Sequence, residues 1–110
     1  MAEMKATVKE IFDGMPATFI PAKAAGVTAV IQFDITGDGG GKWHAAIDNG
    51  ALRVIEGQHS SPHLTLSAKA ADYIAISNGK LNDQLAFMTG RVTAKGDLAL
   101  AMKMARMFRR

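Results

Sequence analysis

The sequence predicts an α+β fold, in which helices cover one face of a five-stranded, mostly antiparallel sheet. Apolar and polar residues alternate in runs that lie mainly between residues 31 and 66, the pattern of half-buried strands. Apolar residues recur at helical spacing mainly near the two ends of the chain, so helices flank the strands rather than alternate with them. At 110 residues, the chain is expected to form one domain, residues 1–110.

The first helix is expected where apolar residues return every three or four positions. Gly14 and Pro16 are predicted to end it, because glycine and proline are common at and after helix ends. The segment 16–27 then predicts a turn or a short helical piece, anchored by Phe19 and Ile20. The apolar residues of the helix are Met4, Val8, Ile11, Phe12 and Met15.

The strands are predicted from period-two alternation and from the turns between them. The glycine-rich segment 37–42 indicates a hairpin connection, and Asn49-Gly50 favours a type I′ turn. The apolar positions are Ile31, Phe33 and Ile35 (alternating with Gln32 and Asp34), Trp43, Ala45 and Ile47, the run 51–56, Leu64 and Leu66, and finally Val92 and Ala94.

Three further helices are predicted from capping residues. Ser67 is expected to cap a helix over 68–77, and Asn82 a short helix closed by Gly90. Asp97 is expected to cap the last helix. The inward-facing residues expected in the first of these are Tyr73, Ile74 and Ile76, and the short helix holds Leu85, Phe87 and Met88.

The last helix has more apolar surface than a small core requires. Its apolar residues fill an arc of roughly 220° at about 100° per residue, whereas an amphipathic helix needs about 100°. The surplus needs a lipid, a second subunit or a membrane as partner. Methionine adapts to irregular space, so three of them in one helix favour a lipid pocket over core packing alone. The arc comprises Leu98, Leu100, Ala101, Met102, Met104, Ala105, Met107 and Phe108.

Composition excludes several other classes. The absence of cysteine rules out disulfides, thiolate metal sites and a cysteine nucleophile. The N-terminus lacks the apolar run of a signal peptide, and no segment approaches the ~20 apolar residues of a membrane span, so we expect a cytoplasmic protein. The net charge of +3 comes with few aromatic residues and no recognition motif, which argues against nucleic acid.

No motif predicts catalysis. The run GDGGGK lacks the first glycine and the final Ser or Thr of a phosphate-binding loop. His59 and His63 flank Pro62 in an expected loop and have no evident third ligand, which argues against a metal site. His44 and Asp48 are predicted to lie on a solvated strand face. We therefore expect no catalytic residue, no metal and no cofactor.

The runs FDITGDGGGKWHAAIDNG and KLNDQLAFMTGRVTAKGDLALAMKMA closely resemble the sterol carrier protein type-two domain. The likeness extends from about Phe12 to Met107 and is most specific between Gly79 and Asp97. It implies a five-stranded sheet with helices on one side and a hydrophobic tunnel. It also implies non-catalytic binding and transfer of sterols, fatty acids, acyl-CoA or phospholipids.

The resemblance also implies a place of action and a class of ligand. Animal members end in a peroxisomal signal, whereas this chain ends Phe108-Arg109-Arg110, so peroxisomal delivery is not expected. A short domain of this kind is typical of bacteria, and most bacteria make no sterol. A fatty acyl chain or phospholipid is therefore expected rather than cholesterol. The alternative is a protein-interaction or dimerisation module that uses the same apolar surface.

Under the carrier interpretation, apolar residues from the sheet and three helices line the tunnel. Basic residues at the end of the last helix contact a lipid head group or a membrane surface, although a solvated helix face would account for them equally. The expected lining is Phe33, Trp43, Ile74, Ile76, Leu85, Phe87, Met88, Leu100, Met104, Met107 and Phe108, and the expected head-group contacts are Arg106, Arg109 and Arg110.

Overall fold

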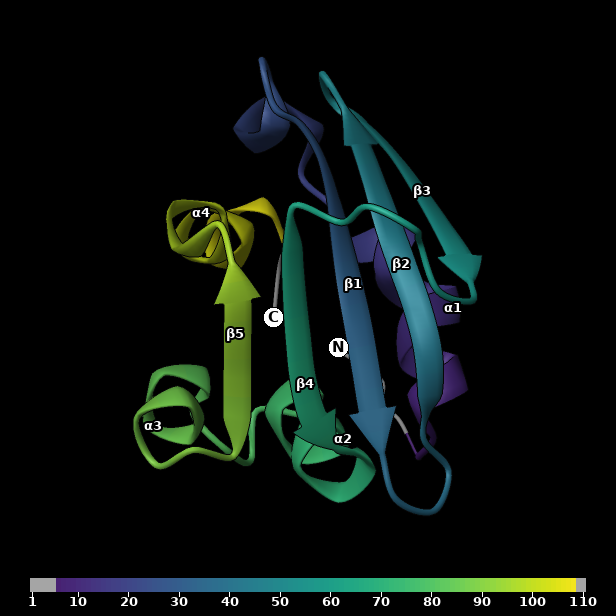
Figure 1. Cartoon of the computed structure of the whole chain (residues 1–110), viewed down its shortest axis with the longest axis vertical. Helices are drawn as coiled ribbons and strands as arrows, with labels where there is room; N and C mark the ends of the chain where they lie inside the picture. Colours follow the sequence, from purple (N-terminus) through teal and green to yellow (C-terminus); the bar gives the residue numbers. More distant parts are fainter. Residues whose placement is uncertain (1–5, 109–110) are drawn as a thin grey trace.

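Five strands form one mixed sheet in the order β3-β2-β1-β4-β5 (Figure 1). The structure is a computed structural model that describes residues 6–108, apart from the side chain of Ala105. Three of the four strand pairings are antiparallel, and β1 and β4 pair in parallel. The expected α+β fold with five strands is confirmed. The strands are β1 (Thr28–Thr36), β2 (Gly41–Asp48), β3 (Ala51–Glu56), β4 (Leu64–Lys69) and β5 (Val92–Gly96).

Helices α1 and α2 lie behind the sheet in Figure 1, and α3 and α4 lie beside its β5 edge. Helix α1 contacts β3 and α2, α3 contacts β5, and α4 contacts β4, β5 and a short 3₁₀ helix. None of the described helices is long and apolar enough to span a membrane. The helices are α1 (Val8–Thr18), α2 (Ala70–Ser77), α3 (Asp83–Met88) and α4 (Leu98–Met107), and the 3₁₀ helix is Pro21–Ala24.

Local capping chemistry accounts for several boundaries. The Asn82 side chain accepts a hydrogen bond from the Leu85 N–H, and Asp97 accepts one from the Leu100 N–H, so both predicted N-caps are confirmed. Asn49 and Gly50 have φ values of 45° and 89°, as a type I′ turn requires at both central residues.

Two helix boundaries were predicted wrongly. Helix α1 continues through Gly14 and Pro16 to Thr18, because proline removes one hydrogen bond without breaking the bonds around it. The Met15 carbonyl still accepts hydrogen bonds from the Phe19 N–H and the Thr18 hydroxyl. Helix α2 begins at Ala70 and not at residue 68, and Ser67 does not cap it, because β4 extends to Lys69 to complete its pairing with β1.

The ends of the first and last helices meet. Phe19 and Phe108 form an isolated antiparallel bridge, and their ring centroids lie 5.4 Å apart. The Ile20 N–H donates to the Met107 carbonyl at 2.6 Å. This contact joins the C-terminal end of α4 to the segment that leaves α1.

The segment 57–63 crosses the outer face of the sheet, in front of β1 and β2 (Figure 1). Gln32 on β1 is only 2% exposed beneath it. The Gln32 amide nitrogen donates to the Trp43 carbonyl at 3.1 Å, and its oxygen accepts from the His59 N–H at 2.8 Å. One face of the sheet therefore carries α1 and α2, and the other carries this hydrogen-bonded loop.

Candidate functional site

Helices α3 and α4 present large apolar side chains to the outside. Met88 is 81% exposed and Met102 is 73% exposed, although both are apolar. Helix α3 has six residues and buries only Ala86, so most of its apolar surface has no partner within the described chain. The exposed apolar residues of the two helices are Leu85, Phe87, Met88, Leu98 and Met102.

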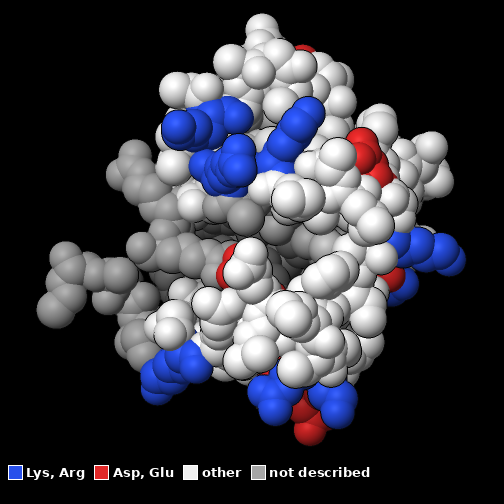
Figure 2. All heavy atoms as spheres, turned by 90° about the vertical axis from the view of Figure 1, so that its left-hand side faces the viewer, with Lys and Arg blue, Asp and Glu red and all other residues white. Residues whose placement is uncertain are grey.

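The surface is hollowed between these two helices. Figure 2 shows this depression below α4 and above α3, on the side of the molecule that carries β5. Basic side chains gather above the depression in this view, and α4 carries the exposed basic residues Lys103 and Arg106. An apolar surface next to positive charge suits an amphiphile with an anionic head.

The predicted lining residues fall into three groups in the structure. The α3 members are exposed, whereas members on the sheet and on the inner side of α4 are buried. A third group is half-buried and packs against the core. The exposed set is Leu85, Phe87 and Met88; the buried set is Phe33, Trp43, Ile76, Leu100 and Met107; the half-buried set is Ile74, Met104 and Phe108.

Of the predicted head-group residues, Arg106 is exposed in the last turn of α4. Arg109 and Arg110 lie outside the described residues. Leu98 and Met102 were absent from the expected lining, although the apolar arc of the last helix contained both. Their membership of the arc was the sequence signal that pointed to these two positions.

Phe33 and Trp43 belong to an aromatic cluster beneath α1. The Phe12 ring stacks on Trp43 with centroids 4.6 Å apart, and meets Phe33 edge-on at 5.1 Å. Tyr73 from α2 also stacks against Phe12, with ring centroids 5.5 Å apart. This geometry is typical of a packed core. Phe12 and Tyr73 therefore belong with two of the predicted lining residues, although neither was predicted as one.

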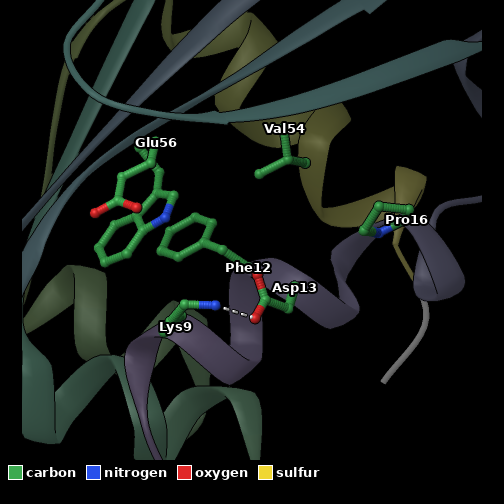
Figure 3. A pocket seen from close by; sticks show the side chains of 7 residues that line it. Lys9, Phe12, Asp13, Pro16, Val54 and Glu56 are labelled. Atoms are coloured by element: carbon green, nitrogen blue, oxygen red, sulfur yellow. Dashed lines mark hydrogen bonds and ion pairs between the residues drawn. The ribbon is translucent and has the colours of Figure 1, made fainter.

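A small pocket opens between α1 and β3, above the same cluster (Figure 3). Its volume is about 240 Å³, below the range of about 300–1,000 Å³ for typical ligand sites. Charged residues share its lining with Phe12 and Trp43. Lys9 donates a hydrogen bond to Asp13 at 2.7 Å, and this bond raises the pKa of the Lys9 ammonium above its ordinary value. Size and charge both make this pocket a poor site for an acyl chain.

The three histidines use Nδ1 in backbone hydrogen bonds. His63 accepts from the Val30 N–H at 3.0 Å, and His59 accepts from the Ser61 N–H at 3.0 Å. Within residues 6–108, no group of three His, Asp or Glu side chains is placed to hold a metal ion. Asp48 is exposed as expected, but the expectation that His44 lies on a solvated strand face was wrong. The segment 57–63 buries His44, which bonds the Gly57 carbonyl through Nδ1.

The chain is similar in sequence and in structure to proteins of one family. The sequence model of the SCP-2 sterol transfer family matches residues 10–109. A zebrafish (Danio rerio) hydroxysteroid dehydrogenase-like protein 2 is 29% identical over 91% of this chain. The chain spans only 24% of the length of that relative.

Two solved structures from the mosquito Aedes aegypti match over most of both chains. The crystal structure of sterol carrier protein 2 like 2 is 26% identical with a TM-score of 0.73, and each chain is covered to 92%. The solution structure of the palmitated form is 27% identical with a TM-score of 0.70, covering 94% of this chain and 91% of that one.

Proposed function

The chain belongs to the SCP-2 sterol transfer family, and we propose that it carries a lipid in an apolar tunnel between its sheet and its helices. The observation that supports this best is the exposed apolar surface of α3 and α4 on both sides of the depression. Such a surface on a small protein usually marks a binding site. A lipid that enters between the two helices would remove much of it from water.

We infer an acyl chain as the apolar part of the ligand. Each buried methylene contributes about 0.8 kcal/mol before the cost of ordering the chain. Methionines at the opening suit a flexible guest, because their side chains adapt to irregular shapes. The palmitated mosquito relative supports the same class. Fatty acids, acyl-CoA and phospholipids all fit this description, and a sterol remains a second possible cargo.

The proposed path runs from the exposed apolar residues of α3 inward along α4. Leu100 and Met107 are buried on the inner side of α4, and Met104 is half-buried between them. Arg106 is exposed in the last turn of α4, where it would contact an anionic head group or a membrane surface. The other predicted lining residues extend the same path toward the sheet and α2.

A displacement assay with a fluorescent fatty acid tests the proposal. We expect saturable binding of long-chain fatty acids or acyl-CoA with micromolar or tighter affinity. Absence of saturable binding by any acyl ligand would refute carriage. Lipid retained from expression should first be removed from the protein, because a site that is already occupied would also give no binding signal.

We also propose that the domain carries its ligand without chemical conversion. The histidines are engaged with backbone groups, as described above, and the sequence contains neither cysteine nor a nucleophile elbow. Purified protein should therefore release no free fatty acid or CoA from acyl esters. Steady release that disappears when one polar residue such as His44 is substituted would contradict this.

The same exposed surface supports a second candidate function, a protein-interaction or dimerisation module. A second copy or a host protein would then cover α3 and α4, and no lipid would be retained. Native mass spectrometry of protein purified from cells separates the two. Lipid masses on a monomer support carriage, whereas an empty dimer supports the interaction module.

A further inference from the structure

We propose that a second pocket, where the end of β4 meets the first turn of α2 and the loop after α3, binds a phosphate group. This pocket has a volume of about 510 Å³ and lies at the end of β4, beside the loop that joins α3 to β5. The inference does not involve Arg106, and it does not depend on lipid carriage. The residues that line the pocket are Thr36, Ser67, Ala68, Lys69, Asp72, Thr89, Gly90, Arg91 and Thr93.

Two cations stand side by side in this pocket. Val92 pairs with Ala68, so Arg91 and Lys69 follow as neighbours just beyond the last paired residues of β5 and β4. Like charges at neighbouring positions on adjacent strands repel each other. Neither cation forms an ion pair with a carboxylate anywhere in residues 6–108. A bound anion would offset the repulsion between Lys69 and Arg91.

Hydroxyl groups complete the lining. Ser67 and Thr93 are partners in the β4–β5 register and therefore share one face of the sheet. Neither side chain forms a hydrogen bond within the described part of the chain, so both can donate to an incoming oxygen. Two cations with adjacent hydroxyl donors form a typical environment for phosphate oxygens.

Two carboxylates limit the charge of this site. Asp72 lines the pocket itself and would repel an anion. Asp34 is the register neighbour of Ser67, but Lys42 lies 3.8 Å from its carboxylate and offsets its charge. Asp72 therefore offers a test with the opposite sign to that of the cations. Removing its charge should strengthen phosphate binding, an effect that a purely structural role for the pocket does not predict.

The experiment is a titration of ¹⁵N-labelled full-length chain with inorganic phosphate, followed by backbone amide shifts. We expect saturable shifts at Lys69–Asp72 and at residues 91–93. Lys69→Gln and Arg91→Gln should each weaken binding by about tenfold or more, and Asp72→Asn should tighten it severalfold. Lys95→Gln is the matched control, because Lys95 lies on β5 outside the pocket, and it should change affinity by less than about twofold.

A second titration with monomeric dihexanoyl phosphatidic acid identifies the source of the phosphate. Binding at least about tenfold tighter than inorganic phosphate, with added shifts at Phe87 and Met88, assigns a lipid head group. Equal affinity at the same amides assigns a soluble phosphate compound. Non-saturating shifts spread over all basic residues, or equal weakening by Lys95→Gln, would overturn the proposal. Fatty acid displacement, measured on the same variants, would be unaffected in either case.

Discussion

The two halves of the sheet are packed differently. Under α1, the β3-β2-β1 half is closed by stacked aromatic rings, and Phe12, Phe33 and Trp43 are all buried. On the β4-β5 half, no residue of β5 is buried, and the neighbouring helices α3 and α4 expose apolar side chains. The same kind of residue therefore fills a core on one side and remains available on the other.

This difference indicates how a small domain can combine stability with a ligand site. A well-packed aromatic half can supply much of the free energy of folding by itself. The other half can then remain incompletely packed, which a binding cavity requires. Regions with few buried contacts also open locally at low cost, as the proposed entry of a long acyl chain would require.

Truncation of one core ring should give the largest effect. Phe12 touches three other aromatic rings, so Phe12→Ala should destabilise the protein by about 3–5 kcal/mol in urea unfolding. Leu85→Ala removes an apolar side chain that is 53% exposed and should cost about 0.5 kcal/mol or less. Similar costs for the two variants would show that the halves do not differ.

Glutamate substitutions on α4 should weaken acyl binding more at a position that lines the proposed path than at an exposed surface position. Met104 is half-buried against the core, so Met104→Glu should weaken acyl binding by about tenfold or more. Lys103→Glu places a carboxylate at an exposed polar position of the same helix and should weaken it much less. Fatty acid displacement gives the affinities, and circular dichroism with thermal melts establishes folding.

Two outcomes would contradict this assignment of Met104. Parental affinity in a folded Met104→Glu variant would exclude Met104 from the lining. If that variant does not fold, Met104→Gln tests the position without a charge. Unchanged binding by folded Met104→Gln together with failure of the glutamate variant would place Met104 in the solid core.

Two helix caps should show smaller and unequal effects. The Thr7 side chain accepts a hydrogen bond from the Glu10 N–H and caps α1, so Thr7→Ala should cost about 1 kcal/mol of global stability. Asn82→Ala removes the cap of α3, which buries little, so the loss should appear as faster amide exchange within α3. Equal losses of global stability would mean that α3 unfolds only with the whole domain.

Removal of the exposed ion pair between Lys9 and Asp13 on α1 should have the smallest effect. Its hydrogen bond raises the Lys9 pKa, so any stabilisation is fully present at pH 7 and is lost only as the pH rises through that raised value. Both side chains are largely exposed, and water screens their attraction. The urea midpoint of Lys9→Met at pH 7 should therefore equal that of the parent, and a clear decrease would assign the pair a structural role.

Features set by neighbouring residues could be predicted from the sequence. The caps at Asn82 and Asp97 and the turn at Asn49-Gly50 each depend on a few adjacent positions, and all three are present. The parallel pairing of β1 with β4 depends on contacts between distant segments, which alternation does not reveal. The helix through Pro16 was missed because Met15 and Phe19 bury their side chains and hold the backbone in place.

The candidate site was harder to predict than the fold. Periodicity identified the apolar residues of α3 and α4 but gave no measure of their exposure, which depends on what packs beside each helix. Gln32 and His44 looked like outward polar positions, yet a loop from elsewhere in the chain covers both. The pocket around Lys69 and Arg91 was missed because residues from four separate segments form it.

The bridge between Phe19 and Phe108 has a consequence for the order of folding. It connects segments that are synthesised near the beginning and near the end of this chain, so it closes a very long loop. Such contacts form late, because the chain entropy lost on closure must be offset by structure already present. The β1-β2-β3 meander can assemble from adjacent hairpins before then. The helix α4, with its share of the proposed lipid path, would dock last, when the rest of the fold is in place.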